Sequence, residues 1–241
     1  MAQLSRLAIL FLGLGATALV AQDAAAEGAT QTNHSLLSMV FGSGPVEWIL
    51  LILSVVGVSL GIQRMLTIKR DVLVPDGLVD DIHNVFADGV NDDSVDDALN
   101  MVSGDPSMLG EVLAAALDKK DFGYPSMAEA AETVGAAEHN KYMTQISWLS
   151  LLAAIGPMLG LLGTVVGMIG AFLVMASSGG NVNPSMLAND IGGAMITTAT
   201  GLIIAIPMMF FFFFLRARIN ACVLDAGVLT AEVLDYFRAE K

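Results

Sequence analysis

The sequence has little charge and few of the side chains on which soluble enzymes rely. Only 15% of its 241 residues are charged, whereas 55% are hydrophobic, and the mean hydropathy is +0.68. Soluble globular domains carry about 25% charged residues, so this composition favours a membrane protein. The single cysteine, Cys222, excludes a disulfide bond within the chain.

Basic residues are also scarce. Eleven Lys and Arg stand against 24 Asp and Glu, which gives a net charge of −13. Most of the acids lie between residues 71 and 138, where Lys119 and Lys120 are the only bases. Such a surface would repel nucleic acid and anionic lipid. We therefore expect no nucleic-acid partner and interpret this region as a solvated, highly soluble face.

Four apolar stretches come near the roughly 20 residues that cross a bilayer core of about 30 Å. They are residues 7–20, 46–62, 146–175 and 188–215. The first is short, follows Arg6 and leads to the A-x-A sequence Ala24-Ala25-Ala26, as in secretory signals. We predict a cleaved signal peptide over residues 1–26. Cleavage after Ala18 and an uncleaved fourth span are the alternatives.

The distribution of basic residues predicts the orientation of the other three spans. Basic residues flank one end of each of these three spans. They are Arg64, Lys69, Arg70, Lys141, Arg216 and Arg218. Residues 176–187, between the second and third spans, carry no charge. The positive-inside rule then predicts that residues 64–145 and 216–241 lie in the cytoplasm, and that the mature N-terminus and the loop 176–187 lie outside.

We therefore expect an all-α membrane protein with three transmembrane helices and long cytoplasmic helical extensions. After the signal peptide, the predicted parts in chain order are a periplasmic lead (27–45), transmembrane helix 1 (46–63), a cytoplasmic helical domain (64–145), transmembrane helix 2 (146–175), a periplasmic loop (176–187), transmembrane helix 3 (188–215) and a cytoplasmic C-terminal helix (216–241).

Within 64–145, apolar residues recur at helical spacing in three runs, 78–86, 95–102 and 109–117. Asp92-Asp93-Ser94 predicts the N-cap of the second helix. Ser126, with Glu129 three residues later, predicts a capping box for a last helix.

No proline interrupts the chain between Met127 and Trp148. We therefore predict that this last helix continues into the second span as one rod of over 40 residues, about 70 Å long. The third span is expected to continue in the same way through Arg216 to Phe237.

The second and third spans carry small and hydroxylated residues where a plain anchor would have leucine or valine. The small residues at helical spacing are Gly156, Gly160, Gly163 and Gly167 in the second span, and Gly193, Thr197, Gly201 and Ala205 in the third. Such stripes let helix backbones approach closely in lipid. Pro207 is expected to bend or loosen the third span.

Four threonines, Thr164, Thr197, Thr198 and Thr200, belong to the same two spans. One interpretation is close packing, with each hydroxyl bonded back to its own helix. The other is a polar path, which three threonines within one turn favour.

Few groups in the spans could carry chemistry. Their acids are Asp190 and, at the outer end of the first span, Glu47. Intramembrane carboxylates are functional candidates, although Asp190 is expected in the first turns of its helix, where it favours the helix dipole. Histidine, cysteine and lysine are absent from the spans, so a Ser–His or metal site cannot form there, and one aspartate excludes an aspartyl dyad. We expect no enzyme activity, metal or cofactor.

Two stretches carry a family resemblance: IGPMLGLLGTVVGMIGAF at 155–172 and ITTATGLIIAIP at 196–207. They resemble the TolQ/ExbB/MotA proton-channel family, and in particular its three-span ExbB/TolQ branch. The resemblance covers about residues 40–240 in layout and is specific over 148–210. It implies a multi-pass protein of the bacterial inner membrane, with the mature N-terminus in the periplasm and the C-terminus in the cytoplasm. It also implies a homopentamer, embedded in membrane lipid, whose second and third spans line a central pore. A single-span ExbD/TolR-like protein would sit in the pore, and proton flow would drive biopolymer transport or mechanical work on a TonB-like or other load protein.

Carried over residue by residue, Thr164 and Thr198 match the family's pore threonines. Gly193 stands where ExbB and TolQ have a third-span glutamate. Asp190, three residues earlier on roughly the same face, is a candidate replacement. Alternatively, the partner's aspartate suffices, as in the flagellar-stator branch, which lacks this acid.

Two further readings differ in function. A non-conducting pentameric scaffold would explain the glycine at 193, and a sodium-coupled stator-type motor would explain the threonine-rich third span. We predict that the glycine stripes bring subunits together. For a conducting assembly we also predict that Thr164, Thr198, Thr197 and Asp190 line the ion path.

Overall fold

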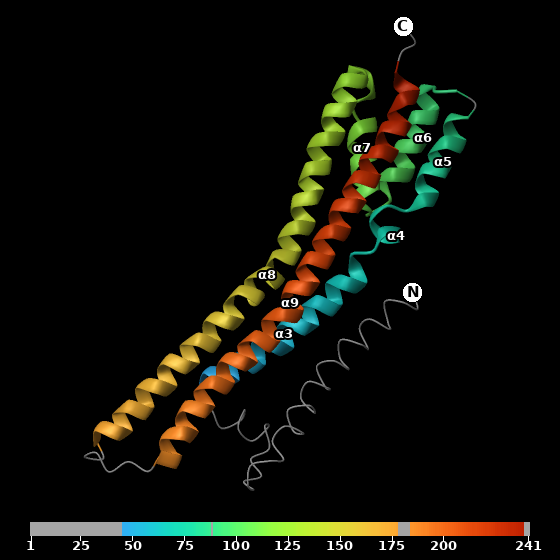
Figure 1. Ribbon diagram of the computed structural model, residues 1–241. Helices are drawn as coiled ribbons and strands as arrows, with labels where there is room; N and C mark the ends of the chain where they lie inside the picture. The colour runs from blue at the N-terminus through green and yellow to red at the C-terminus, as the bar shows by residue number, and fades with distance from the viewer. Residues whose placement is uncertain (1–44, 88, 178–183, 239–241) are drawn as a thin grey trace. The chain divides into compact units, whose positions relative to one another are not determined.

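The computed structural model describes residues 45–87, 89–177 and 184–238, which form helices and connecting turns without any strand (Figure 1). In order they are α3 (Pro45–Thr67), α4 (Arg70–Leu73), α5 (Asp76–Phe86), α6 (Asp92–Ser103), α7 (Met108–Leu117), the 3₁₀ turn η1 (Lys120–Phe122), α8 (Tyr124–Ser177), α9 (Pro184–Leu234) and the 3₁₀ turn η2 (Asp235–Phe237). The predicted signal peptide (1–26), nearly all of the lead (27–45) and the middle of the loop (176–187) lie outside the described residues.

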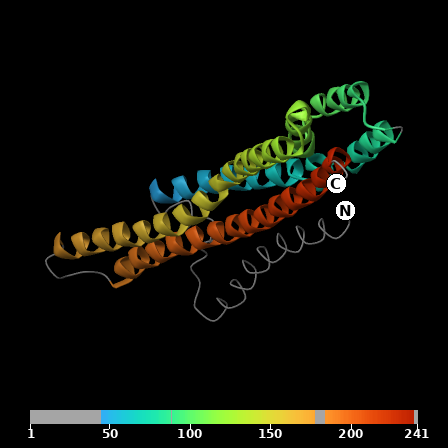
Figure 2. The ribbon, with the colours of Figure 1, turned by 90° about the horizontal axis from the view of Figure 1, so that it is seen from above.

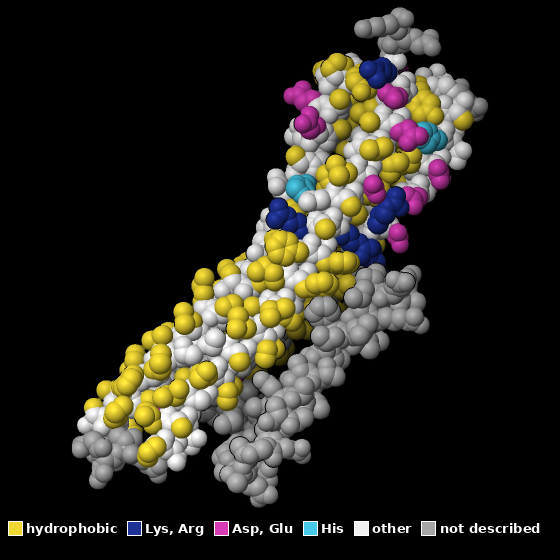
Figure 3. All heavy atoms as spheres, viewed as in Figure 1, with side chains coloured by type: hydrophobic (Ala, Val, Ile, Leu, Met, Phe, Trp, Pro, Cys, Tyr) yellow, Lys and Arg dark blue, Asp and Glu magenta, His cyan; other side chains and the backbone are white. Residues whose placement is uncertain are grey.

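Three helices, α3, α8 and α9, are long and apolar enough to cross a membrane. Figure 3 shows hydrophobic side chains along one half of α8 and α9 and charged side chains gathered on the other half. We call the half that holds 45–67, 146–177 and 184–215 the spans. Its far end, near Ser177 and Pro184, is the loop end.

The predicted continuous rods are confirmed. α8 runs for 54 residues without interruption, which corresponds to about 80 Å, and α9 runs for 51. Each helix passes through a proline in its apolar half, Pro157 in α8 and Pro207 in α9. A proline inside a helix removes the hydrogen bond to the carbonyl four residues earlier, yet the helical path continues past both sites.

The helices α8 and α9 lie side by side and antiparallel in both ribbon views (Figures 1 and 2). Gly163 faces Thr197 in the spans, and far from it the His139 Nε2 lies 3.0 Å from the Asn220 Oδ1. In an antiparallel pair with a constant register, the residue numbers of facing residues have a constant sum. That sum is about 360 for both Gly163–Thr197 and His139–Asn220. One register therefore holds along the whole contact. α3 packs against both helices, because Gly57 faces Met208 and Leu152.

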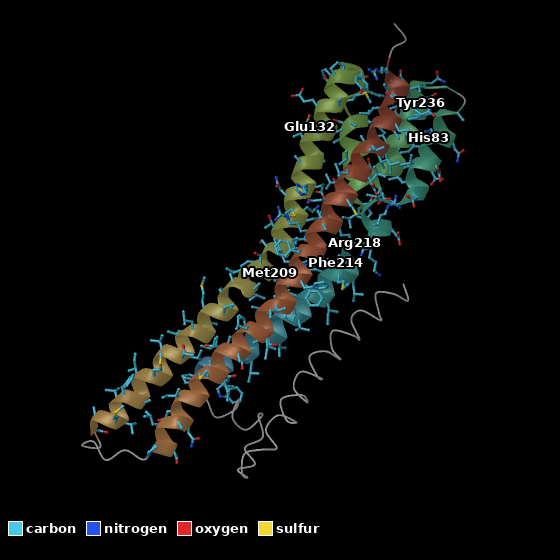
Figure 4. The ribbon with its side chains drawn as sticks, viewed as in Figure 1. His83, Glu132, Met209, Phe214, Arg218 and Tyr236 are labelled. Carbon is cyan, nitrogen blue, oxygen red and sulfur yellow. The ribbon has the colours of Figure 1, made fainter. Side chains whose placement is uncertain are left out.

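The other half is a polar module made of residues 68–145 and 216–238. Helix α7 packs against the extensions of α8 and α9, α5 packs on α9, and α6 packs on α5 and α7. Together they enclose an interior of large aliphatic side chains. Fully buried examples are Ile82, Leu109, Leu113, Leu117, Met127, Ile219 and Val233. The end of α9 closes this interior. There the His83 Nδ1 of α5 lies 2.9 Å from the Tyr236 hydroxyl (Figure 4).

The predicted cap of α6 is wrong by one residue. Asn91 precedes the helix, and its backbone N–H donates to the Ser94 Oγ at 2.8 Å. Ser94 is thus the third helical residue, and its side chain accepts a hydrogen bond from the backbone of the capping residue Asn91. Asp92 and Asp93 fall in the first turn, where carboxylates favour the helix dipole.

The predicted start of the last helix is also wrong. α8 begins at Tyr124, so Ser126 lies in its first turn and is not its cap. The chain turns at Gly123, whose positive φ of 82° is readily adopted by glycine and disfavoured for residues with a side chain. Pro125 follows in the first turn, where its missing N–H removes no helical hydrogen bond. This glycine–proline pair sets the boundary in place of the hydroxyl cap.

Candidate functional site in the spans

Five glycines bring the backbones of α8 and α9 together. We call Gly156, Gly160, Gly163, Gly167 and Gly201 the glycine interface. A Cβ atom at Gly160 would lie 2.9 Å from the Thr198 Cα, and one at Gly156 would lie 3.0 Å from the Gly201 carbonyl oxygen. A side chain at either position would have to move backbone rather than a flexible side chain. The stripes predicted to join subunits thus form a contact between two helices of one chain.

Thr198 forms a polar link across this interface. Its Oγ1 donates to the Gly160 carbonyl oxygen of α8 at 2.9 Å. The adjacent Thr197 is only 2% exposed, its methyl group packs on Gly163, and its hydroxyl donates to the Gly193 carbonyl oxygen at 3.2 Å. Two neighbouring threonines therefore differ: Thr197 fills the contact, while Thr198 bonds between the helices.

The other two threonines are bonded within their own helices. The Thr164 Oγ1 donates to the Leu161 carbonyl oxygen at 2.7 Å, and the Thr200 Oγ1 donates to the Ile196 carbonyl oxygen at 3.0 Å. Back-bonding of this kind is common for Thr in membrane helices. The structure therefore brings Thr197 and Thr198 into one contact with α8 but leaves the Thr164 hydroxyl outside it.

Gly193 and Asp190 lie differently from the glycine interface. A Cβ atom added at Gly193 would meet nothing within 4 Å, so a larger side chain has room there. Asp190 is exposed in the second turn of α9, and its side chain makes no hydrogen bond or ion pair to the residues that the structure describes. The described residues of a single chain therefore leave both Gly193 and the Asp190 side chain uncovered.

Glu47 is the residue whose environment the sequence reasoning missed. Its side chain is 1% exposed, and neither carboxylate oxygen has a hydrogen-bond partner. The buried residues of α3 are Glu47, Leu50, Gly57 and Gly61, which share one helical face by their spacing. That face packs on α8 and α9, as Gly57 and Gly61 show. The spacing from Glu47 to the two glycines could have revealed its burial.

Outside the spans, the lone cysteine is enclosed. Cys222 is 2% exposed in the polar module, and this burial raises the pKa of its thiol. Among the described residues, no three His, Cys, Asp or Glu side chains come together in a way that could hold a metal ion.

The sequence region that contains these contacts matches a known family. A model of the MotA/TolQ/ExbB proton channel family matches residues 104–226, about half of the chain, including the whole glycine interface. The chain belongs to the MotA/TolQ/ExbB proton channel family. This confirms the resemblance carried by 155–172 and 196–207. Proteins of this family are channel and transport proteins, which agrees with three helices able to cross a membrane.

Individual relatives are similar over parts of the chain. The biopolymer transport protein exbB1 of Vibrio cholerae is 43% identical over 70 residues, which is 29% of this chain and 31% of that protein. The Tol-Pal system protein TolQ of Haemophilus influenzae is 36% identical over 83 residues, 34% of this chain and 36% of that protein. The chain thus spans about a third of the length of these curated relatives. An ExbB-like biopolymer transport protein of Synechocystis is 28% identical over 212 residues, 87% of this chain and 77% of that protein.

Proposed function

We propose that this chain is the channel subunit of a proton-driven motor in a bacterial inner membrane. Family membership supports the class, and the Thr198–Gly160 hydrogen bond is the observation that carries the site. In this proposal the loop end faces the periplasm and the polar module faces the cytoplasm. The basic residues at the junction of spans and module favour that orientation.

The proposed assembly is a homopentamer around a single-span ExbD/TolR-like partner. A single chain leaves much apolar surface uncovered, since only 11% of the most apolar 18-residue stretch of α8 is buried. Lipid, neighbouring copies and the partner would cover the rest. The partner would pass force to a TonB-like or other load protein.

Thr198 suits the handling of a partner's carboxyl group. A hydroxyl is one donor and two acceptor sites, so while it donates to Gly160 it can accept from a protonated carboxyl. When that carboxyl loses its proton, the hydroxyl can rotate and donate to the carboxylate instead. We propose Thr198 as the central residue of the ion path. Thr164 and Asp190 would join it only through surfaces shared with other chains.

The test is ion flux in liposomes that contain the chain and its ExbD/TolR-like partner. We expect Thr198→Val to abolish proton flux, because valine keeps the shape and removes the hydroxyl. Thr200→Val is the matched control, because that hydroxyl bonds within its own helix. If both variants conduct like the wild type, the role of Thr198 is wrong.

Two alternatives have distinct outcomes in the same assay. The open position at Gly193, without a carboxylate, supports a non-conducting scaffold, which requires wild-type flux at background. A sodium-coupled motor requires a flux that depends on Na⁺ at constant pH. Replacement Gly193→Glu restores the acid of ExbB and TolQ in a place with room for it, and we expect the variant to fold.

A further inference from the structure

Glu47 is a buried acid without any visible partner. It is 1% exposed, and both of its carboxylate oxygens lack a hydrogen bond. Burying an ionised carboxylate alone is strongly unfavourable, so such groups are neutralised by a proton, a cation or hydrogen-bond donors. An unpartnered, buried carboxylate therefore indicates a binding site for something positively charged.

The described residues of the spans place no cation beside Glu47. Helix α3 packs on the spans of α8 and α9, and the described spans 45–67, 146–177 and 184–215 contain two titratable side chains besides Glu47, which are Arg64 and Asp190. Arg64 lies near the other end of α3, about 25 Å from Glu47 along the helix. Asp190 is exposed and also acidic. Among these described stretches, no Lys, Arg or His therefore lies within reach of Glu47.

Glu47 lies at about the same level along the helices as the hydrogen bond between Thr198 and Gly160. The helices α3 and α9 run parallel, because Gly57 faces Met208 and Gly61 faces Phe211. Glu47 lies ten residues before Gly57, and Thr198 lies ten residues before Met208. Since both helices rise about 1.5 Å per residue, Glu47 lies at about the depth of Thr198. In Figures 1 and 2 the first turn of α3 lies well short of the loop end of α8.

We propose that Glu47 is a binding site for a small monovalent cation, a proton or Na⁺, inside the spans. Resting on the proposed function, we further infer that Glu47 supplies the chain's own carboxylate to ion transfer, in place of the acid absent at Gly193. It takes up the cation from the loop end and releases it at the depth of Thr198.

Dicyclohexylcarbodiimide tests the site directly, because this apolar reagent modifies protonated carboxyl groups in membrane proteins. The full-length assembly is labelled between about pH 5 and pH 9, with and without NaCl, and modified peptides are identified by mass spectrometry. We expect Glu47 to be modified, because a proton bound to this carboxyl group leaves it in the form that reacts. If Na⁺ is the ligand, NaCl slows the reaction at constant pH, whereas KCl does not. Labelling of Asp190→Asn should match the wild type, and Glu47→Gln should show none at this position.

One result would overturn the site. It is that Glu47 stays unmodified at every pH although the unfolded protein is modified there, which means that a fixed partner already occupies the carboxylate. Glu47→Gln should assemble normally, since a neutral amide needs no cation, and Glu47→Asp serves as a second variant if it does not.

Flux separates this inference from the proposed function. If the wild type conducts and Glu47→Gln falls to background, Glu47 acts in transfer. If both conduct equally, the role in transfer is wrong, whatever the labelling shows. If the wild type itself does not conduct, the proposed channel function fails, and the labelling alone decides whether Glu47 binds a cation.

Discussion

In the polar module Leu113, Leu117 and Ile219 meet in an interior of large aliphatic side chains, whereas in the spans α8 and α9 touch through Gly156 and Gly160. The two regions use the same two long helices but different packing. In water, large apolar side chains gain free energy by leaving the solvent. In lipid that gain disappears, and close backbone approach with hydrogen bonds takes its place.

The difference also concerns what is left uncovered. The module closes its interior with helices of its own chain, as far as the buried Phe86, whose ring contacts Tyr236 of η2. The spans leave most of their surface open, since the most apolar stretches of α3, α8 and α9 are 22%, 11% and 28% buried. The module is thus a conventional folded core, and the spans are a surface for lipid and other chains.

The largest expected effect lies in the module. Leu113→Ala removes a fully buried side chain and should lower the free energy of unfolding by about 2–5 kcal/mol. Thermal unfolding of the purified protein measures it. Leu224→Ala is the control, because Leu224 is 71% exposed, and should change the stability by less than about 0.5 kcal/mol. Equal losses would show that the module has no core of this kind.

In the spans, adding one methyl group should destabilise the protein, although by less than removing a large side chain from the module does. Gly160→Ala places a Cβ atom 2.9 Å from the Thr198 Cα and should destabilise the protein by about 1–3 kcal/mol. Gly193→Ala adds the same methyl group where nothing lies within 4 Å, and should be neutral or slightly stabilising. The comparison fails if both variants melt at the same temperature.

A smaller effect on stability is expected at the hydrogen bond between α8 and α9. Thr198→Val should lower stability by only about 0.6 kcal/mol, the average for such bonds in membrane proteins. Its effect on flux should be far larger, and Thr198→Ser should restore both. A loss of stability that accounts for the loss of flux would reduce Thr198 to a packing residue.

The smallest expected effect is chemical and leaves the fold intact. Cys222 should react slowly with maleimide, because burial both blocks access and raises the pKa of the thiol. Ala221→Cys, on the exposed side of α9, should react quickly by comparison. Mass spectrometry of a timed reaction gives both rates from one sample. Rapid modification of Cys222 would mean that the module opens on that timescale.

Much of this could be predicted from sequence, because long apolar stretches and unbroken helical patterns are strong local signals. The rods Tyr124–Ser177 and Pro184–Leu234 followed from them. The predictions that failed were the exact helix boundaries, which depend on the few residues around each helix end. Ser126 fits the pattern of a helix cap, but Gly123 and Pro125 make α8 begin earlier, at Tyr124.

The site was harder, because its residues differ by which neighbour they face. Thr197 and Thr198 are adjacent in sequence, yet about 100° apart around the helix, so only the pairing with α8 reveals which hydroxyl reaches Gly160. Likewise Glu47 could be placed at the end of α3, but its burial depends on where α3 lies against the other two spans.

The unbroken course of α8 through both regions has a mechanical consequence. With no joint where spans and module meet, the helix acts as a lever arm. A tilt of about 5° at one end of a rod about 80 Å long displaces the other end by about 7 Å. Because α9 keeps the same register beside it, we expect the two helices to move as a pair. A tilt of about 5° at Thr198 would then displace the end of α9 in the module, about 54 Å away, by about 5 Å.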